Sequence, residues 1–140
     1  MKIITILGAR PQFIKAAALS HAFKENNLIN EVIVHTGQHF DENMSKIFFD
    51  QLQIPKPHYQ LDSGGMTHGA MTAYQLAEIE KILLKELPNY IVLYGDTNST
   101  LSGALAASKL HVPIIHIEAG LRSFNMNMPE EINRIITDRL

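Results

Sequence analysis

The 140-residue chain contains no cysteine and no tryptophan. The absence of cysteine excludes disulfides, thiolate metal sites and cysteine nucleophiles together, and it fits a reducing compartment. An excess of positive charge is also missing, because 12 Lys and Arg residues face 14 Asp and Glu residues, for a formal net charge of −2. The basic surface that nucleic-acid binding requires is therefore not expected.

Long hydrophobic runs are missing as well. No apolar stretch approaches the about 18 residues that a membrane-spanning helix requires. The opening MKIITILGAR has an apolar run that ends at Gly8, which is too short for a signal peptide and favours a first strand. A composition of 46% apolar and 19% charged residues is typical of a soluble globular domain. We expect a cytoplasmic protein that contacts no membrane.

The chain does contain strand and helix patterns in regular alternation. Continuous apolar runs predict buried strands at 2–7, 31–36, 90–94 and 113–118. A weaker pattern predicts a short edge strand at 58–61. Helical patterns begin at Pro11, Asp41, Met66, Leu101 and Pro129. The first helix should carry on one face Phe13, Ile14, Ala17, Ala18 and Leu19. The fold class is therefore α/β, a doubly wound, mostly parallel, Rossmann-like sheet with strand order 3-2-1-4-5.

In such a sheet, ligands bind beyond the carboxyl ends of the strands, where the strand order reverses. Three polar residues follow strands at this edge: Arg10 after the first, Asp96 after the fourth and Glu118 after the fifth. Neighbouring strands lie ~4.8 Å apart. We therefore expect these three side chains to line a single crevice.

The segment after the first strand, GARPQFIK, suits an anionic ligand. A glycine turn followed by a helix that starts with proline should leave backbone N–H groups unpaired at the positive end of the helix dipole. Arg10 and Lys15 would add positive charge for a phosphate group. The segment lacks the spacing of a dinucleotide fingerprint or a P-loop, and a surface arginine with a solvated lysine would look the same.

Asp96 has two interpretations. It follows Gly95 at a strand end, where an aspartate often caps the next helix. Thr97 or Asn98 could cap that helix equally well, which leaves Asp96 available for a site.

Glu118 closes a strand that should be buried on both faces. An unpaired carboxylate is costly to desolvate there. A partner such as Arg122 or His116 could neutralise it, or partial burial could make it a usable acid or base.

Glu130 and Glu131 follow Pro129 in the first turn of a helix, where carboxylates complement the dipole by about 0.3–1 kcal/mol each. Adjacent helical positions point about 100° apart. One glutamate should therefore face the crevice while the other meets solvent or Arg134. The seven histidines show no zinc-type spacing, so no protein-bound metal is expected.

Five blocks, GARPQFIK, HTGQHFD, GDTNSTL, IEAGLRS and PEEINR, closely resemble in order and spacing the non-hydrolysing UDP-N-acetylglucosamine 2-epimerases of bacteria. Their residues resemble the branch that acts on UDP-2,3-diacetamido-2,3-dideoxyglucuronic acid more closely than the enzymes that act on UDP-GlcNAc. The resemblance covers the whole chain and implies a longer protein with two Rossmann-like domains, similar to GT-B glycosyltransferases. Residues 1–140 would be its N-terminal domain, truncated, with the second domain absent.

The resemblance also implies the chemistry. The C2 proton of a UDP-sugar is removed, UDP is eliminated to give a 2-acetamidoglucal, and UDP adds back with protonation on the other face, in a pathway to surface polysaccharides. Asp96, Glu118 and Glu130 would be catalytic, Arg10 and Lys15 would bind the substrate, and no redox cofactor or metal would be needed. The full-length protein would be a homodimer.

The sequence departs from the enzymes that act on UDP-GlcNAc at two places: Gln12, where Glu is common, and the loop residues 124–126. These departures leave the identity of the substrate open. Two other functions stay open. A GT-B glycosyltransferase would need an acceptor and form no epimer, and a non-catalytic nucleotide-sugar-binding domain would use the acids only to order sugar hydroxyls. The 140-residue chain alone should be nearly inactive, since half of the cleft would be missing.

Overall fold

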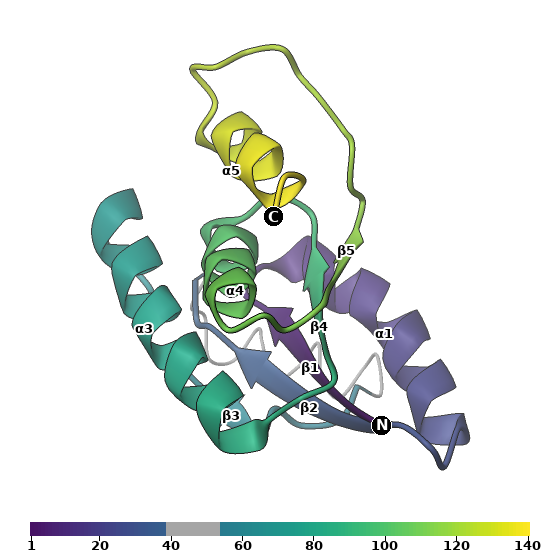
Figure 1. Ribbon diagram of the computed structural model, residues 1–140. Coiled ribbons are helices and arrows are strands. Elements are labelled where there is room, and N and C mark those ends of the chain that lie inside the picture. The colour runs from purple at the N-terminus through teal and green to yellow at the C-terminus, as the bar shows by residue number, and fades with distance from the viewer. Residues whose placement is uncertain (39–53) are drawn as a thin grey trace.

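The computed structural model describes residues 1–38 and 54–140 (Figure 1). Its strands are β1 (Lys2–Leu7), β2 (Asn30–His35), β3 (Tyr59–Gln60), β4 (Tyr90–Tyr94) and β5 (Ile114–Ile117). Its helices are α1 (Arg10–Glu25), α3 (His68–Glu86), α4 (Asn98–Lys109) and α5 (Pro129–Thr137). The helix predicted to begin at Asp41 lies outside the described residues.

All described strand pairs are parallel, and their order is β3-β2-β1-β4-β5. This confirms the predicted fold class and strand order. The strand order reverses between β1 and β4, so the chain segments that leave these two strands diverge at the carboxyl edge of the sheet. Among the described residues, no helix is long and apolar enough to cross a membrane.

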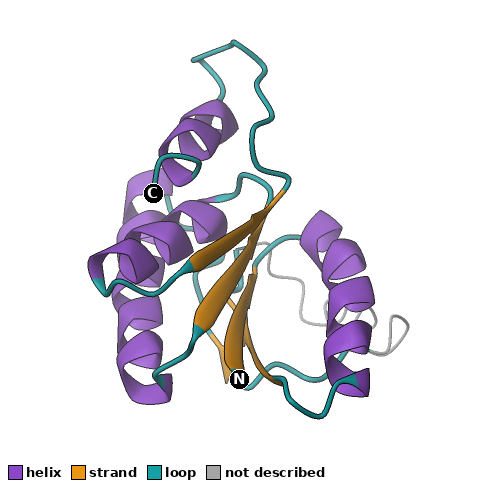
Figure 2. Cartoon of the chain, turned by 45° about the vertical axis from the view of Figure 1, so that its right-hand side comes forward, coloured by secondary structure: helices purple, strands orange, loops and turns teal. Residues whose placement is uncertain are grey.

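Helices cover both faces of the sheet. Figure 2 shows α1 on one face and α3 and α4 on the other. Two apolar clusters fill the space between the layers: one includes Ile4, Ile91 and Leu93 with α3 and α4, and the other includes Ile33 and Phe13 with α1. This burial explains why the central strands are hydrophobic throughout rather than alternating.

The apolar face predicted for α1 is only partly right. Phe13 and Ala17 are buried, but Ile14 is 56% exposed and Ala18 is also exposed. Gln12 occupies a buried position instead, with 3% exposure. A polar side chain takes this place because its amide is fully used in hydrogen bonds to the neighbouring turns.

Helix α5 is oriented against its own hydrophobic pattern. Its isoleucines Ile132 and Ile136 are 41% and 36% exposed, whereas Glu131, Asn133 and Thr137 are buried. The polar side therefore faces the rest of the domain and the apolar side faces outward. Buried polar groups usually have hydrogen-bond partners. Asn133 has one at the exit of β4 and Glu131 has them in the loop before α5, whereas the Thr137 hydroxyl has none among the described residues.

Candidate functional site

The exits of β4 and β5 lie against each other at the carboxyl edge of the sheet. The Gly95 N–H donates to the carbonyl of Ile117 at 3.0 Å. Gly95 has φ +62°, and a Cβ placed on it would lie 3.5 Å from Oε2 of Glu118. The Glu118 carboxylate thus reaches over the turn that carries Asp96, so the structure brings these two predicted site residues together.

The backbone of Glu118 is itself unusual, with φ +72°. A non-glycine residue in this left-handed region is strained and persists only where its surroundings hold it. Its carboxylate forms an ion pair with Lys15 on α1, and both side chains remain partly exposed. The suggested partners Arg122 and His116 are wrong, because both contact Asp138 instead.

Asp96 is not the cap of α4. Thr97 is the N-cap and accepts a hydrogen bond from the Thr100 N–H at 3.3 Å. The Asp96 carboxylate instead accepts from Arg134 of α5, whose Nε and Nη2 lie 2.8 and 2.7 Å from Oδ2. Asn133 donates to the Asp96 carbonyl at 2.9 Å. Helix α5 therefore fixes both the side chain and the backbone of Asp96.

The two neighbouring glutamates of α5 have different surroundings, and the predicted contact of one of them with Arg134 is made by Glu131. Glu131 is 1% exposed and accepts from the N–H groups of Ser123 and Phe124, at 2.9 and 3.0 Å, and from Arg134 at 2.7 Å. The Ser123 N–H, helped by Arg134 and the Phe124 N–H and opposed by burial, lowers the pKa of Glu131 to about 2. This glutamate anchors the loop between β5 and α5, which arches over the molecule in Figure 1.

Glu130 is half-buried, and the described part of the chain offers it no hydrogen-bond or ion-pair partner. It lies four residues before Arg134, so both side chains project from the same side of α5. Arg134 contacts Asp96. Glu130 therefore stands about 6 Å along the helix axis from the residue that holds Asp96.

The exit of β1 is more closed than the sequence indicated. The N–H groups of Gly8 and Ala9, expected to be unpaired, both donate to Oε1 of Gln12 at 2.7 and 3.0 Å. The Gln12 amide also donates to the Tyr94 carbonyl at 2.7 Å, which ties the start of α1 to the end of β4. Arg10 is exposed at the first position of α1. Gln12 is thus a structural residue of the turn.

Residues of α5 are what the sequence pattern missed. Arg134 was expected near a glutamate but not near Asp96, and Asp138 was not singled out. The one local signal is the three-residue spacing between Glu131 and Arg134, which allows an ion pair on a helix. Within 1–38 and 54–140, no group of three or more His, Cys, Asp or Glu side chains is placed to hold a metal ion.

Comparisons with known proteins identify the family of the chain. The family model described as UDP-N-acetylglucosamine 2-epimerase matches residues 21–140. The chain is 70% identical over 140 residues to the UDP-2,3-diacetamido-2,3-dideoxy-D-glucuronate 2-epimerase of Pseudomonas aeruginosa, covering 100% of this chain and 40% of that protein. It is 57% identical to a UDP-N-acetylglucosamine 2-epimerase homolog of Methanococcus maripaludis, covering 100% of this chain and 39% of the relative.

Solved structures give the same result. The crystal structure of Methanocaldococcus jannaschii UDP-GlcNAc 2-epimerase in complex with UDP-GlcNAc and UDP has a TM-score of 0.95 and 54% identity, covering 99% of this chain and 38% of that one. A glycosyltransferase from Streptomyces sp. SF2575, at 18% identity and a TM-score of 0.58 over 83% of this chain and 38% of that one, shares the fold alone. The chain spans about 40% of the length of the curated relatives it matches.

Proposed function

This chain belongs to the UDP-N-acetylglucosamine 2-epimerase family, and we propose that it supplies the catalytic acids of a non-hydrolysing UDP-sugar 2-epimerase. The observation that carries the proposal is the gathering of carboxylates at one edge of the sheet. Asp96 leaves β4, Glu118 leaves β5 with its oxygen over Gly95, and Glu130 projects from α5 on the side of Arg134. Carboxylates in this number suit proton transfer at a sugar carbon.

The proposed reaction breaks the C2–H and C1–O bonds in the elimination and forms both again in the addition. A carboxylate removes the C2 proton, the electron pair forms the C1–C2 double bond of a 2-acetamidoglucal, and the C1–O bond to UDP breaks. UDP then adds back to C1 while an acid delivers a proton to the other face of C2. Arg10 and Lys15, at the start of α1, would stabilise the negative charge of the departing diphosphate.

The three carboxylates differ in their partners, as an acid/base set requires. Glu118 has the ammonium of Lys15 beside it and Asp96 has the guanidinium of Arg134. Glu130 has no cation within ion-pair distance among the described residues. Substitutions Asp96→Asn, Glu118→Gln and Glu130→Gln should each reduce turnover much more than substrate affinity.

The substrate is proposed to be a UDP-2-acetamido sugar, and the diacetamido uronic acid is favoured over UDP-GlcNAc. The higher identity to the Pseudomonas aeruginosa relative supports this preference. The test uses the protein at the full length of its relatives, here called the full-length protein. It is incubated with each UDP-sugar, and products are identified by mass spectrometry and NMR.

Formation of the C2 epimer from either sugar supports the proposal, and faster conversion of the diacetamido uronic acid supports the preference. Binding without any epimer would favour a nucleotide-sugar-binding domain. Transfer of the sugar to an added acceptor without epimer would favour a glycosyltransferase. The similarity of this chain to a solved glycosyltransferase structure concerns the fold alone.

We also infer that the full-length protein is a homodimer in the cytoplasm, where UDP-sugars are made. An apolar groove of about 440 Å³ between α3 and α5 supports self-association, since it exposes Ile132 beside Leu76 and Ala73. Light scattering should find two copies, and Ile132→Lys should give a monomer. Ile14→Lys, on the exposed face of α1, is the matched control. A wild-type monomer would contradict the inference.

A further inference from the structure

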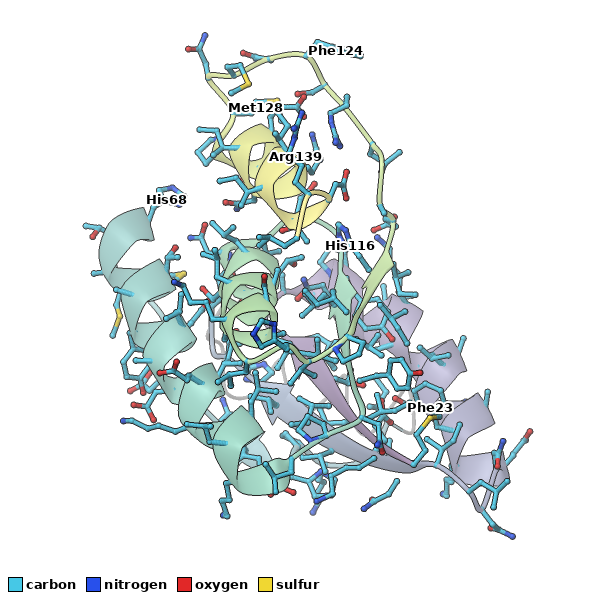
Figure 3. The ribbon with its side chains drawn as sticks, in the orientation of Figure 1. Phe23, His68, His116, Phe124, Met128 and Arg139 are labelled. Atoms are coloured by element: carbon cyan, nitrogen blue, oxygen red, sulfur yellow. The ribbon has the colours of Figure 1, made fainter. Side chains whose placement is uncertain are left out.

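A histidine whose side chain is largely covered lies between the exits of β4 and β5. His116 sits on β5 with 8% of its side chain exposed, and Figure 3 shows it beneath α5 near the ends of both strands. Its Nε2 lies 2.7 Å from the carbonyl oxygen of Gly95. This carbonyl belongs to the peptide bond that joins Gly95 to Asp96. The ring therefore contacts the peptide plane that carries the candidate acid of β4.

The other ring nitrogen faces a carboxylate. Nδ1 of His116 lies 2.9 Å from Oδ1 of Asp138, just beyond α5. Burial alone would raise the pKa of Asp138, but hydrogen bonds from Arg122, the Gly120 N–H and His116 outweigh it and lower the pKa. The imidazole thus spans two acceptors, with the Gly95 carbonyl at one ring nitrogen and the Asp138 carboxylate at the other.

The second oxygen of Asp138 reaches the exit of β5. Oδ2 accepts from the Gly120 N–H at 2.9 Å and from Arg122 Nη1 at 2.6 Å. Gly120 has φ +82° and lies two residues after Glu118. Asp138 therefore connects two parts of the site. One oxygen contacts the turn that follows Glu118, and the other contacts the imidazole of His116, which in turn contacts the Gly95–Asp96 peptide.

We propose that His116 and Asp138 are positioning residues that lock the two strand exits together and so fix the geometry of Asp96 and Glu118. The proposal rests on the proposed epimerase function, because Asp96 and Glu118 act as acids or bases only there. Neither residue needs to touch the sugar. Their role is to hold two reacting groups in place, and a displacement of about 1 Å can lower a rate by about 10²-fold.

The test compares two substitutions of Asp138 in the full-length protein. Asp138→Ala removes the contacts to His116, Gly120 and Arg122, so kcat should fall on the order of 10²-fold while KM stays within about threefold. Asp138→Asn keeps an oxygen for Gly120 and Arg122 and turns its amide N–H₂ toward His116. The ring then accepts at Nδ1 and still donates from Nε2 to Gly95, so kcat should return to within about fivefold of wild type.

A folded Asp138→Ala variant with wild-type kcat, or with raised KM and unchanged kcat, would overturn the proposal. So would an Asp138→Asn variant as slow as Asp138→Ala. Thermal unfolding and UDP binding by calorimetry establish that each variant is folded.

Should Asp138→Ala not fold, His116→Gln can still donate near the Nε2 position to Gly95, whereas His116→Asn reaches only toward Asp138. The glutamine variant should be faster, and an equal or faster asparagine variant contradicts the role assigned to Gly95.

The wild-type protein separates this proposal from the proposed function. If no epimer forms from any UDP-sugar, the proposed function fails regardless of His116. The ¹⁵N NMR shifts of His116 report the pair directly, without catalysis. A proton on Nε2, where the ring contacts the Gly95 carbonyl, supports the arrangement, and an unprotonated Nε2 overturns it.

Discussion

Glu130 and Glu131 are adjacent in sequence, yet their surroundings give them opposite tasks. The Glu131 carboxylate is enclosed by the N–H groups of Ser123 and Phe124 and by Arg134. Glu130, about 100° around the helix, is half-buried with no partner in the described ranges 1–38 and 54–140. A carboxylate that is already saturated with donors anchors a loop, and one without donors can accept a proton from a substrate.

The substitutions Glu130→Gln and Glu131→Gln should therefore have opposite effects. Glu130→Gln should lower kcat on the order of 10²-fold or more and leave the unfolding temperature unchanged. Glu131→Gln should lower the unfolding temperature, because its amide N–H₂ would face one of the two backbone N–H groups. Steady-state kinetics and thermal unfolding of both variants measure the contrast. A fully active Glu130→Gln beside a stable, inactive Glu131→Gln would reverse the assignment.

The same enclosure makes Glu131 sensitive to acid. Its pKa is lowered to about 2 from an ordinary 4.5, so the unfolded chain takes up a proton at higher pH than the folded one. The stabilisation by Glu131 is complete above about pH 4.5 and is lost as the pH falls toward 2. The free energy of unfolding, measured across this window, should fall less in Glu131→Gln than in wild type. Identical slopes of this free energy against pH would exclude the effect.

His35 gives a second pH dependence, at higher pH. It is fully buried at the end of β2 and stacks on Phe13 with ring centroids 5.2 Å apart. Burial lowers its pKa to about 4 from 6.5, so the unfolded state binds the proton first as the pH falls. Stability should decline by about 3 kcal/mol between pH 6.5 and 4. Denaturant unfolding of His35→Gln should lose this decline, and an unaltered decline would contradict the prediction.

At the scale of elements, the strands and the start of α5 at Pro129 could be predicted from the sequence, but the orientation of α5 could not. The runs KIITIL and YIVLY contain enough buried apolar residues to indicate strands. The strand before Glu118 was also predicted, but its expected burial on both faces is wrong, since Ile115 of β5 is 38% exposed. The carboxyl-edge rule places Asp96 and Glu118 at the same edge. The isoleucines of α5 indicated a helix, but its buried face is the polar one. Hydrogen bonds from Asn133 and Arg134 to Asp96 decide that orientation, and such contacts between distant segments leave no local pattern.

Helix α4 gives a test of packing between elements. Its Gly103 lies so close to β4 that an added Cβ would stand 2.6 Å from Cδ2 of Leu93, which is fully buried. Gly103→Ala should therefore destabilise the fold by about 1–3 kcal/mol, because the core must shift to make room. Gly69→Ala on α3, where nothing lies within 4 Å of the added carbon, should be neutral or slightly stabilising in the same denaturant titration. Equal stability of the two variants would contradict the close packing.

For the whole molecule, the sheet topology explains how distant residues form one site. The order β3-β2-β1-β4-β5 places the exits of β1, β4 and β5 at one edge, and α5 returns over that edge to bring Glu130, Arg134 and Asp138 to it. Residues from the start of α1 to the end of α5 are thus brought to one edge of the sheet. The resemblance to epimerases predicted the roles, and the fold provides the proximity that those roles require.

Incorporation of solvent hydrogen at C2 tests the central claim most directly. The full-length protein is incubated in heavy water with its UDP-sugar, and deuterium is located by NMR and mass spectrometry. We predict deuterium at C2 of the epimer during turnover, and loss of this exchange in Asp96→Asn, Glu118→Gln and Glu130→Gln. Formation of the epimer with its original C2 protium retained would contradict proton abstraction by these carboxylates.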